Sequence, residues 1–448
     1  MSEVPSPIVL EPWLARIANR EVHVGVIGLG YVGLPLVLLF SEAGIRVTGF
    51  DIDASKVAAL NAGQSYIHRI ESAAIAAAQA AGFHATTDFS AINACDAVLI
   101  CVPTPLKDDH EPDMSYVSGT VESLAPYTRT GQLIVLESTT YPGTTTELVV
   151  PTLERLAQNG LKVSRNQEPG LLVAFSPERE DPGNTTTPRR AIPKVVGGIN
   201  SIAAQVASAL YQTVFDRTVV VSSTEAAEMT KLLENIYRVV NIALVNELKQ
   251  LCLAMGIDIW EVIDAASTKP FGFQPFYPGP GIGGHCIPVD PFYLSWRARQ
   301  FNQPTRFIEL AGEVNEAMPG FVVQTIERAL EREGKQLRDA KVLLLGIAYK
   351  RDIDDLRESP ALTVYSLLVQ AGAKAAYNDP FFPTVRSGRH YALNASSTPL
   401  SEAAGFDCVV LVTDHSAYDI PQLVAGSRIF VDTRNATRNM TAANIVRC

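Results

Sequence analysis

The sequence has few basic residues for its length, and this shortage limits the partners that it can bind. Among its 448 residues, Lys and Arg number 37 and Asp and Glu number 47, for a formal net charge of −10. Nucleic acids and anionic membranes are bound through a broad positive field, which such a chain lacks. We therefore expect neither partner. A small anionic ligand remains compatible with this charge, because basic side chains and helix N-termini act locally.

Cysteines are also few. The sequence has no C-x-x-C motif, and the intervals between its six cysteines suit neither a zinc site nor a disulfide framework. We expect no bound metal and, because disulfides belong to oxidising compartments, a cytoplasmic location. The six residues are Cys95, Cys101, Cys252, Cys286, Cys408 and Cys448.

Long apolar runs are almost absent. Only the run from Val22 to Phe40 could pass for a membrane span or a signal peptide, but it contains His23, four glycines and Pro35, and no cleavage-like site follows it. The sequence therefore indicates a soluble chain.

The length and the pattern of apolar residues predict an α/β fold with more than one domain. A single hydrophobic core stops growing well below 448 residues, so two or three domains are expected. From Val22 a strand over 22–27, a helix to about Ala43 and a strand over 45–50 alternate, and the apolar runs 96–102 and 132–137 are typical of buried parallel strands. This pattern predicts a doubly wound parallel sheet.

A long helix separates this region from a second one of the same type. Ser222-Ser-Thr-Glu225 is a capping-box pattern that opens a helix of roughly thirty residues, ending near Met255, long enough to bridge domains. Strand–helix alternation resumes at Lys341. We predict two Rossmann-like domains joined by a helical domain with this long central helix. The expected divisions are an extension over 1–20, a first α/β domain over 21–221, a helical domain over 222–333 and a second α/β domain over 334–448.

A glycine-rich turn predicts the cofactor. Gly28-Leu-Gly30-Tyr-Val-Gly33 lies between the first strand and its helix, and Asp51 closes the second strand. These glycines permit the turn, the approach of a pyrophosphate and close helix packing, while the acid can bind a ribose diol. A purely structural turn would not need the acid. Asp51 favours NAD over NADP because it repels a 2′-phosphate, an effect that nearby Lys56 partly offsets.

Cys286 is the candidate nucleophile. It lies in the loop Gly279–Asp290, whose glycines leave it little steric cover, and Lys231 could favour its thiolate. An isolated cysteine is more often a small buried hydrophobe, and we interpret the other five in that way. His285 could act as a base or merely cap the loop.

Polar residues on the long helix and after two strands complete the candidate set. Lys231 and Asn235 are four residues apart, so an ammonium and an amide can converge on one oxygen, although Lys231 could instead pair with Glu228 on a solvated face. Arg238 continues this face. Ser176–Arg179 and Glu137–Gly143 each follow a buried strand, where open α/β sheets keep their sites, but either segment could simply turn the chain.

Together these segments resemble the UDP-glucose/GDP-mannose dehydrogenase family over nearly the whole chain from Val22. The resemblance implies an NAD-binding N-terminal domain, a helical middle domain that forms a homodimer or larger homo-oligomer, and a C-terminal domain that holds the UDP of a UDP-sugar. The matching stretches are Gly28–Gly33, Cys101–Pro105, Glu137–Gly143, Ser176–Arg179, Lys231–Asn235, Gly279–Asp290, Leu345–Lys350 and Arg357–Ser359.

The resemblance also implies roles for individual residues. Cys286 would form a thiohemiacetal and then a thioester, with Lys231 and Asn235 stabilising the oxyanion. Asp290 and Glu178 are the acid/base candidates, and Thr139 would orient water or substrate. The substrate site would be lined by Glu178, Arg179, Lys231, Asn235, Arg238, Gly283, Tyr349 and Lys350. The cofactor would contact Gly28, Gly30, Tyr31, Val32, Gly33, Asp51, Lys56, Thr104, Thr139 and Arg357.

The implied reaction oxidises the C6 hydroxymethyl of the sugar to a carboxylate. This removes four electrons, so two NAD act in turn while a thiol adduct retains the aldehyde. Ser138–Gly143 and Phe175–Pro182 look like the branch that acts on UDP-N-acetylglucosamine for surface polysaccharide synthesis, whereas Lys269–Tyr277 lacks the arginine often found there in other branches. UDP-glucose and UDP-N-acetylmannosamine are the alternative substrates.

Two alternatives of other kinds fit parts of the sequence. A two-electron hydroxyacid or 6-phosphogluconate type dehydrogenase shares a Rossmann domain followed by a helix with lysine and asparagine, but needs no cysteine. A non-catalytic nucleotide sensor would explain the glycines and Asp51 but gives Cys286 and Lys231 no joint purpose.

Overall fold

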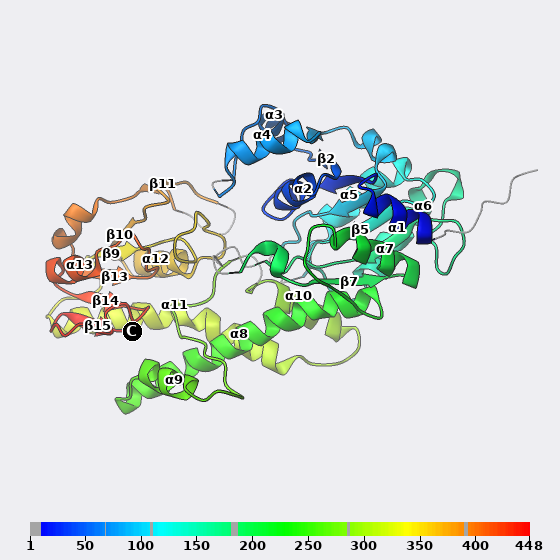
Figure 1. Ribbon diagram of the computed structural model, residues 1–448. Helices are drawn as coiled ribbons and strands as arrows, with labels where there is room; N and C mark the ends of the chain where they lie inside the picture. Colours follow the sequence, from blue (N-terminus) through cyan, green and yellow to red (C-terminus); the bar gives the residue numbers. More distant parts are fainter. Residues whose placement is uncertain (1–9, 68, 108–110, 181–186, 285–286, 389–392) are drawn as a thin grey trace, which may run out of the picture. The chain divides into compact units, whose positions relative to one another are not determined.

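The computed structural model describes the chain except for residues 1–9, 68, 108–110, 181–186, 285–286 and 389–392 (Figure 1). The chain divides into two compact units. The first comprises Met1–Glu234 and Trp296–Phe301, and the second comprises Asn235–Ser295 and Asn302–Cys448.

The first unit is built on an eight-stranded sheet with the order β3-β2-β1-β4-β5-β6-β7-β8. All neighbouring strands are parallel except β6 and β7, which are antiparallel. The order 3-2-1-4-5-6 is that of a dinucleotide-binding domain. The strands are β1 His23–Ile27, β2 Arg46–Phe50, β3 His84–Thr86, β4 Ala97–Ile100, β5 Leu133–Leu136, β6 Leu172–Phe175, β7 Lys194–Gly198 and β8 Thr218–Val220.

Helices cover both faces of this sheet because its central strands are apolar on both sides. Val24 and Val26 of β1 pack with α1, α2 and α7 on one face, whereas Ile27, on the opposite face, packs with α5 and α6. Strands buried on both faces read as continuous apolar runs, which is why β4 and β5 were predictable. The helices are α1 Leu10–Ala18, α2 Gly33–Glu42, α3 Ala54–Asn61, α4 Ser72–Ala80, α5 Ser115–Leu124, α6 Val150–Leu156 and α7 Ser201–Tyr211, and the shorter turns are η1 Phe89–Ala94, η2 Ala125–Tyr127, η3 Thr145–Val149, η4 Gln158–Gly160 and η5 Arg189–Ala191.

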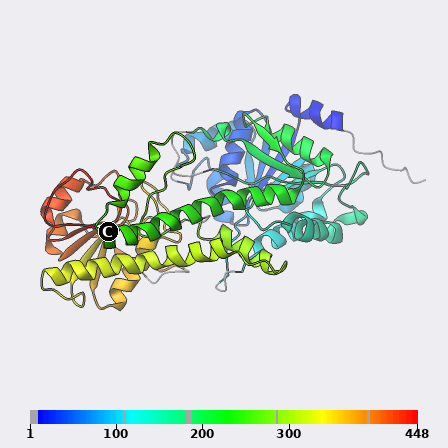
Figure 2. The same cartoon turned by 90° about the horizontal axis from the view of Figure 1, so that it is seen from below.

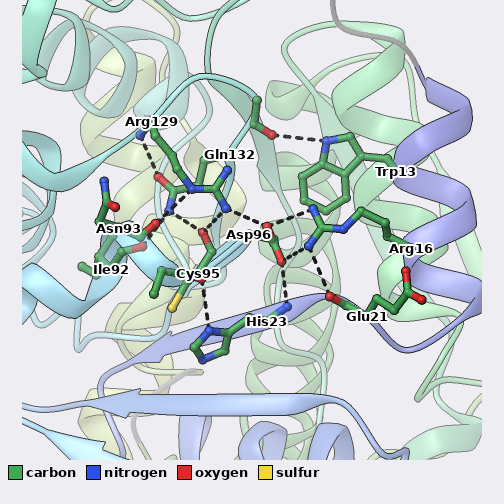
Figure 3. A network of polar contacts seen from close by, with 12 residues as sticks. Trp13, Arg16, Glu21, His23, Ile92, Asn93, Cys95, Asp96, Arg129 and Gln132 are labelled. Atoms are coloured by element: carbon green, nitrogen blue, oxygen red, sulfur yellow. Dashed lines mark hydrogen bonds and ion pairs between the residues drawn. The ribbon is translucent and has the colours of Figure 1, made fainter.

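Within the predicted N-terminal extension, α1 is an integral part of the first unit. Trp13 is buried in the core and donates its indole N–H to the carbonyl of Gly131 over 3.2 Å. Arg16 donates to both carboxylate oxygens of Asp96, at 3.0 and 2.6 Å, and Arg129 binds the same carboxylate at 2.6 Å (Figure 3). Asp96 is 5% exposed, so these two guanidinium groups compensate a nearly buried charge.

The second unit contains a parallel sheet of five strands with the order β10-β9-β13-β14-β15. One face packs on α11 and α12, and the other face packs on α13. A short antiparallel pair, β11 Thr384–Val385 and β12 Ala395–Ser396, lies outside this sheet. The remaining elements are β9 Lys341–Leu345, β10 Lys374–Asn378, β13 Cys408–Leu411, β14 Phe430–Asp432, β15 Ile445–Arg447, α9 Ile259–Ser267, α11 Arg306–Arg332, α12 Pro360–Gln370, η6 Leu400–Gly405 and α13 Ile420–Gly426.

Two long helices lie side by side. Helix α8, Thr224–Met255, begins one residue later than its capping pattern suggested, with Ser223 Oγ accepting the N–H of Ala226 over 3.2 Å. Its second half packs along α11 through Val239, Ala243 and Ala311 (Figure 2).

The predicted fold class is therefore confirmed: α/β, with two doubly wound parallel-sheet regions and a long central helix. The exact divisions at residues 221 and 333 stay a prediction. No helix in the part of the chain that the structure describes is long and apolar enough to cross a membrane.

Candidate functional site

The glycine-rich turn after β1 has the conformation that a pyrophosphate site requires. Gly28 has φ of +88°, and a Cβ there would lie 2.6 Å from the carbonyl oxygen of Cys101. A Cβ on Gly33 would lie 2.0 Å from the carbonyl oxygen of Gly28, so α2 starts too close to the turn for any side chain. A Cβ on Gly30 would meet no atom within 4 Å, which leaves its backbone accessible to a ligand. The geometry of the three glycines thus fits the roles predicted for them, which stay a prediction.

Asp51 stands at the end of β2, beside this turn. Its Oδ2 accepts the N–H of Leu29 over 2.9 Å, and its Oδ1 accepts the N–H of Asp53 over 3.0 Å. Lys56 Nζ lies 3.7 Å from Oδ2. Because a carboxylate offers about four lone pairs, both oxygens retain capacity to accept a ribose hydroxyl. Tyr66 holds the other side of the turn, donating its phenol O–H to the carbonyl of Leu29 over 2.5 Å.

These residues fit NAD. The turn meets the N-terminus of α2, where backbone N–H groups and the helix dipole favour a diphosphate. Tyr31 is 42% exposed and Val32 is half-buried. Both lie in the turn predicted to contact the cofactor.

Two threonines connect the loops after β4 and β5, at the carboxyl edge of the sheet. Thr104 is buried and donates its hydroxyl to the carbonyl of Thr139 over 2.8 Å, and Ser138 donates its hydroxyl to the carbonyl of Val102 over 2.7 Å. The two predicted cofactor contacts, Thr104 and Thr139, are therefore held together by the backbone of neighbouring strands.

Glu178 follows β6 and is held by three donors. Its Oε1 accepts the backbone N–H of Arg179 and of Glu180, each over 2.8 Å, and its Oε2 lies 3.2 Å from Lys194 Nζ. Burial alone would raise the pKa of Glu178, but the Lys194 ammonium and these donors outweigh it and lower that pKa. Glu178 is therefore ionised in the neutral range.

Lys194 itself lies between two carboxylates. Its Nζ is 2.5 Å from Glu137 Oε2, and Tyr211 donates its hydroxyl to Glu137 Oε1. Burial would lower the pKa of Lys194, yet the two carboxylates raise it; burial raises the pKa of Glu137. Sequence patterns did not reveal Lys194, because its partners are 57 and 16 residues distant.

The two arginines predicted to bind substrate differ in their surroundings. Arg179 is engaged within the protein: it pairs with Glu234 at 2.5 Å and donates to the carbonyl of Pro193 over 2.6 Å. Arg238 is exposed on α8.

The alternative partner suggested for Lys231 is committed elsewhere. Glu228 is fully buried and its carboxylate accepts the N–H of Gly143 over 2.6 Å and the N–H and hydroxyl of Thr145 over 2.9 and 2.7 Å. Glu228 thus caps the segment after β5. Lys231 is 7% exposed, so the solvated helix face considered for it is wrong, and its charge contributes to lowering the pKa of Glu178.

In the second unit, both ends of the loop Gly279–Asp290 bind helix α8. Asn246 Oδ1 accepts the N–H of Gly279 over 2.9 Å, and the side-chain amide of Asn235 donates to Asp290 Oδ2 over 2.6 Å. Asp290 begins helix α10, Asp290–Arg299. His285 and Cys286, the candidate base and nucleophile in this loop, lie outside the described residues.

The glycines before Cys286 pack on the loop that follows β9. A Cβ on Gly283 would lie 2.6 Å from Tyr349 Cβ, and a Cβ on Gly284 would lie 2.8 Å from the Tyr349 ring. The N–H of Gly284 donates to the carbonyl of Arg357 over 2.9 Å. Tyr349, predicted to contact substrate, therefore also supports this glycine segment. Lys350 is half-buried beside it, and Arg357, 47% exposed, pairs with Asp355 at 2.7 Å.

A cavity of about 500 Å³ opens at the carboxyl edge of the second sheet. In the order β10-β9-β13 the connections after β9 and β13 diverge, which is where open α/β sheets bind ligands. Trp260 and Tyr277 stack at 5.3 Å on one wall. No local sequence pattern indicates this grouping, which joins four separate segments: Trp260, Asp264, Tyr277, Arg351, Asp414, His415, Ser416, Tyr418, Ile420, Arg434, Asn435, Ala436 and Arg438.

No group of three or more His, Cys, Asp or Glu side chains among the described residues could hold a metal ion. The described cysteines are free, and four of these five are buried: Cys95, Cys101, Cys408 and Cys448.

Comparisons with known proteins agree with this geometry. Three models of the UDP-glucose/GDP-mannose dehydrogenase family match: the NAD binding domain over residues 22–215, the central domain over 225–317 and the UDP binding domain over 343–439. The chain is 36% identical to UDP-N-acetyl-D-mannosamine dehydrogenase of Escherichia coli (strain K12), over 78% of this chain and 82% of that protein. It is 33% identical to NDP-N-acetyl-D-galactosaminuronic acid dehydrogenase of Ralstonia solanacearum, over 92% and 95%.

Among solved structures, UDP-D-ManNAc dehydrogenase from Pyrococcus horikoshii superposes with a TM-score of 0.83 at 30% identity, covering 95% of this chain and 98% of that chain. With three family models in the expected order, the chain belongs to the UDP-glucose/GDP-mannose dehydrogenase family, whose NAD-binding and UDP-binding domains it possesses.

Proposed function

We propose that the protein oxidises the C6 hydroxymethyl of UDP-N-acetylglucosamine to the carboxylate, reducing two NAD for each sugar. The observation that carries this proposal is the attachment of both ends of the Gly279–Asp290 loop to α8, at Asn246 and Asn235. The loop carries the only cysteine that we consider a nucleophile, and α8 carries the ammonium and amide that would stabilise an oxyanion. The product would serve surface polysaccharide synthesis.

The helix spacing supports the roles of Lys231 and Asn235. Residues four apart on a helix share a face, so Lys231 and Asn235 can both donate to one developing oxyanion. Asp290 fixes the amide of Asn235 through the 2.6 Å bond, which leaves the second amide hydrogen of Asn235 for the substrate. Cys286 would attack the aldehyde carbon to give a thiohemiacetal, which the second hydride transfer would oxidise to a thioester, and water would then release the acid.

Ionised Glu178 suits a role as hydrogen-bond acceptor. The described donors occupy three of its roughly four lone-pair positions, leaving one on Oε2 for the sugar or for water. Thr139, at the neighbouring strand end, would orient the same molecule. Asp290 remains the other acid/base candidate.

NAD, when bound, accepts the hydride in each of the two oxidations. Gly28, Gly30 and Gly33 would admit its diphosphate, and Asp51 would accept its ribose hydroxyls. Tyr31, Val32, Lys56, Thr104 and Arg357 stay proposed contacts.

The cavity in the second unit supports binding of the UDP moiety. Its guanidinium groups, Arg351, Arg434 and Arg438, suit a diphosphate, and the stacked Trp260 and Tyr277 offer an apolar wall for a base. Lys350 precedes Arg351 and would contact the same ligand, with Arg179 and Arg238 the further proposed substrate residues.

The sugar is assigned from sequence segments. Ser138–Gly143 resembles the branch that acts on UDP-N-acetylglucosamine, and Lys269–Tyr277 lacks the arginine often found near its middle in other branches. UDP-N-acetylmannosamine is the second candidate, because relatives at 35–36% identity carry that name. UDP-glucose is the third.

Initial rates of NAD reduction over a panel of nucleotide sugars test this proposal. We expect the highest kcat/KM with UDP-N-acetylglucosamine, followed by its manno epimer, and little reaction with UDP-glucose or GDP-mannose. A preference for the manno epimer would transfer the assignment to that sugar. Reaction with none of them would refute the proposal.

We also propose a homodimer or larger homo-oligomer formed through the central helix. Leu233, Tyr237, Leu244 and Leu251 are about half exposed on α8, at spacings that share a face. Light scattering should give a mass of two chains or more. A Leu244→Glu variant should shift it to a single chain, whereas an unchanged mass would place the interface elsewhere.

A further inference from the structure

One buried and one largely buried carboxylate share a buried ammonium in the first unit. The side chain of Lys194 is 3% exposed, that of Glu137 is fully buried and that of Glu178 is 16% exposed. The three come from different strands: Lys194 starts β7, Glu137 follows β5 and Glu178 follows β6. A charge buried in this way is costly unless it is paired and hydrogen-bonded, so the arrangement has a specific requirement for Lys194.

Each contact of Lys194 limits its position. Glu137 Oε2 lies 2.5 Å from Nζ, and Glu137 is fixed in turn by the hydroxyl of Tyr211. The ammonium also lies 5.2 and 5.5 Å from the ring centroids of Tyr211 and Phe215. Its remaining described contact is Glu178 Oε2 at 3.2 Å. Lys194 is thus anchored by groups other than Glu178.

The orientation of Glu178 depends on this contact. Two backbone N–H groups hold Oε1, and they lie in the same segment as Glu178, at residues 179 and 180. Lys194, which belongs to another strand, donates to Oε2 over 3.2 Å. Without it, the described contacts of the carboxylate would all come from its own segment, and no neighbouring strand would direct Oε2.

We propose that Lys194 is a positioning residue, held by Glu137 and Tyr211, that fixes the Glu178 carboxylate as an oriented anion for the reaction. This inference rests on the proposed function, because Glu178 is taken to contact the substrate or water. Lys194 acts through Glu178 and does not itself touch the substrate.

The charged and titratable groups around Glu178 all affect its protonation. Lys194 and Lys231 favour its anion, whereas Glu137 disfavours it. Arg179 is neutralised by Glu234. The groups that interact with Glu178 or with its partners lie on six elements or their flanking loops: Cys101, Glu137, Arg179, Lys194, Tyr211, Lys231 and Glu234.

The test compares the pH dependence of kcat in the intact enzyme. Lys194→Met removes the cation, so the pKa of Glu178 should rise and the acidic limb of the profile should move to higher pH by roughly one unit or more. Since this change leaves Glu137 without its cation, the double variant Glu137→Gln/Lys194→Met removes both charges and protects the fold. Lys194→Arg should restore the wild-type limb at least in part.

A matched control breaks a similar pair away from the site. Arg129→Met removes a guanidinium from nearly buried Asp96, which precedes β4 and therefore lies at the amino edge of the same sheet. It should lower the melting temperature without moving the acidic limb. A purely structural role for Lys194 would give that same result for the double variant.

A double-mutant cycle then shows whether Lys194 acts through Glu178. If it does, Glu178→Gln/Lys194→Met should lose no more kcat than Glu178→Gln alone. Additive losses, or an unshifted acidic limb in Glu137→Gln/Lys194→Met, would overturn the inference. Its failure is distinct from failure of the proposed function, which would appear as absence of turnover in the wild-type enzyme with every sugar.

Discussion

Asn235 donates its side-chain amide to Oδ2 of Asp290 over 2.6 Å, and both residues are almost completely buried. This bond joins the face of α8 that carries Lys231 to the residue where the cysteine-bearing loop ends and α10 begins. A hydrogen bond to a buried carboxylate is strong and short, so it fixes the direction of the remaining amide hydrogen. In the proposed reaction, the amide of Asn235 would thereby be oriented toward the oxyanion before the substrate binds.

Removing this orientation should reduce the rate of the chemical steps. In Asp290→Asn the acceptor charge is lost and a second amide opposes that of Asn235, so kcat should fall by about 10²-fold, the typical loss for one oxyanion donor. The dissociation constant for NAD, measured by titration calorimetry, should change little. Ser295→Ala, on the same helix and also buried, serves as control and should retain kcat. An Asp290→Asn enzyme of normal kcat would contradict the role given to this pair.

The second prediction concerns cofactor choice. Asp51→Ala removes the acceptor for the ribose hydroxyls and the repulsion of a 2′-phosphate. The dissociation constant for NAD should therefore rise by about 10-fold, and the selectivity for NAD over NADP should become smaller. Because Asp51 also accepts the N–H groups of Leu29 and Asp53, one on each oxygen, Asp51→Asn is the control that removes the charge while it keeps one of these two acceptors. Equal selectivity for NAD over NADP in the wild type, Asp51→Ala and Asp51→Asn would exclude Asp51 from the nucleotide site.

Local patterns in the sequence predicted the first domain well. The strand, the glycine turn and the acid at Asp51 follow one another within thirty residues, and each signal is contained in the element that it predicts. The central apolar strands and α8 were equally visible, since a run buried on both faces needs no partner to be recognised.

What the sequence did not reveal depends on pairing across the chain. Lys194 reads as an ordinary polar residue, and only the contact with Glu137, 57 residues away, explains its burial. The cavity beside Trp260 joins four distant segments in the same way. Trp13 and Arg16 lay in a segment interpreted as an extension, because their partners Gly131 and Asp96 belong to other elements.

The third prediction uses the buried carboxylate of Glu228. Burial raises its pKa to about 7 despite its three donors. Between the unfolded value near 4.5 and 7, the folded protein binds more protons, so the contribution of Glu228 to stability falls as pH rises through that window. Glu228→Gln lacks this pH-dependent contribution. The free energy of unfolding of the variant relative to that of wild type should therefore rise from pH 5 to pH 8, by up to about 3 kcal/mol. Melting temperatures measured over this pH range would show the change.

Glu225 is the matched control for this experiment. It lies one turn earlier on α8, and hydrogen bonds to groups such as Thr146 outweigh burial and lower its pKa. Since both its folded and unfolded forms are ionised above pH 5, the difference between Glu225→Gln and wild type should stay constant from pH 5 to pH 8. A constant difference for Glu228→Gln as well would show that Glu228 is ionised throughout.

The fourth prediction concerns helix α1. Trp13→Ala should destabilise the first unit by about 3–5 kcal/mol, because a large buried side chain leaves a cavity and Gly131 loses a donor. Leu14 is 38% exposed on the same helix, so Leu14→Ala should cost much less. Thermal unfolding followed by fluorescence compares the two variants (Figure 3 shows the contacts of Trp13). If Trp13→Ala and Leu14→Ala had equal melting temperatures, α1 would not be required for stability. Activity at 25 °C should persist in both, since Gly131 precedes β5, at the edge of the sheet opposite the site.

The measurement that tests the central claim most directly is the number of NADH molecules formed for each UDP-N-acetylglucosamine consumed, with the product identified by mass spectrometry. A four-electron oxidation through Cys286 predicts two NADH and the uronate, and Cys286→Ala should abolish uronate formation. One NADH per sugar, as a two-electron dehydrogenase would give, or two NADH and normal uronate production by Cys286→Ala, would contradict the account.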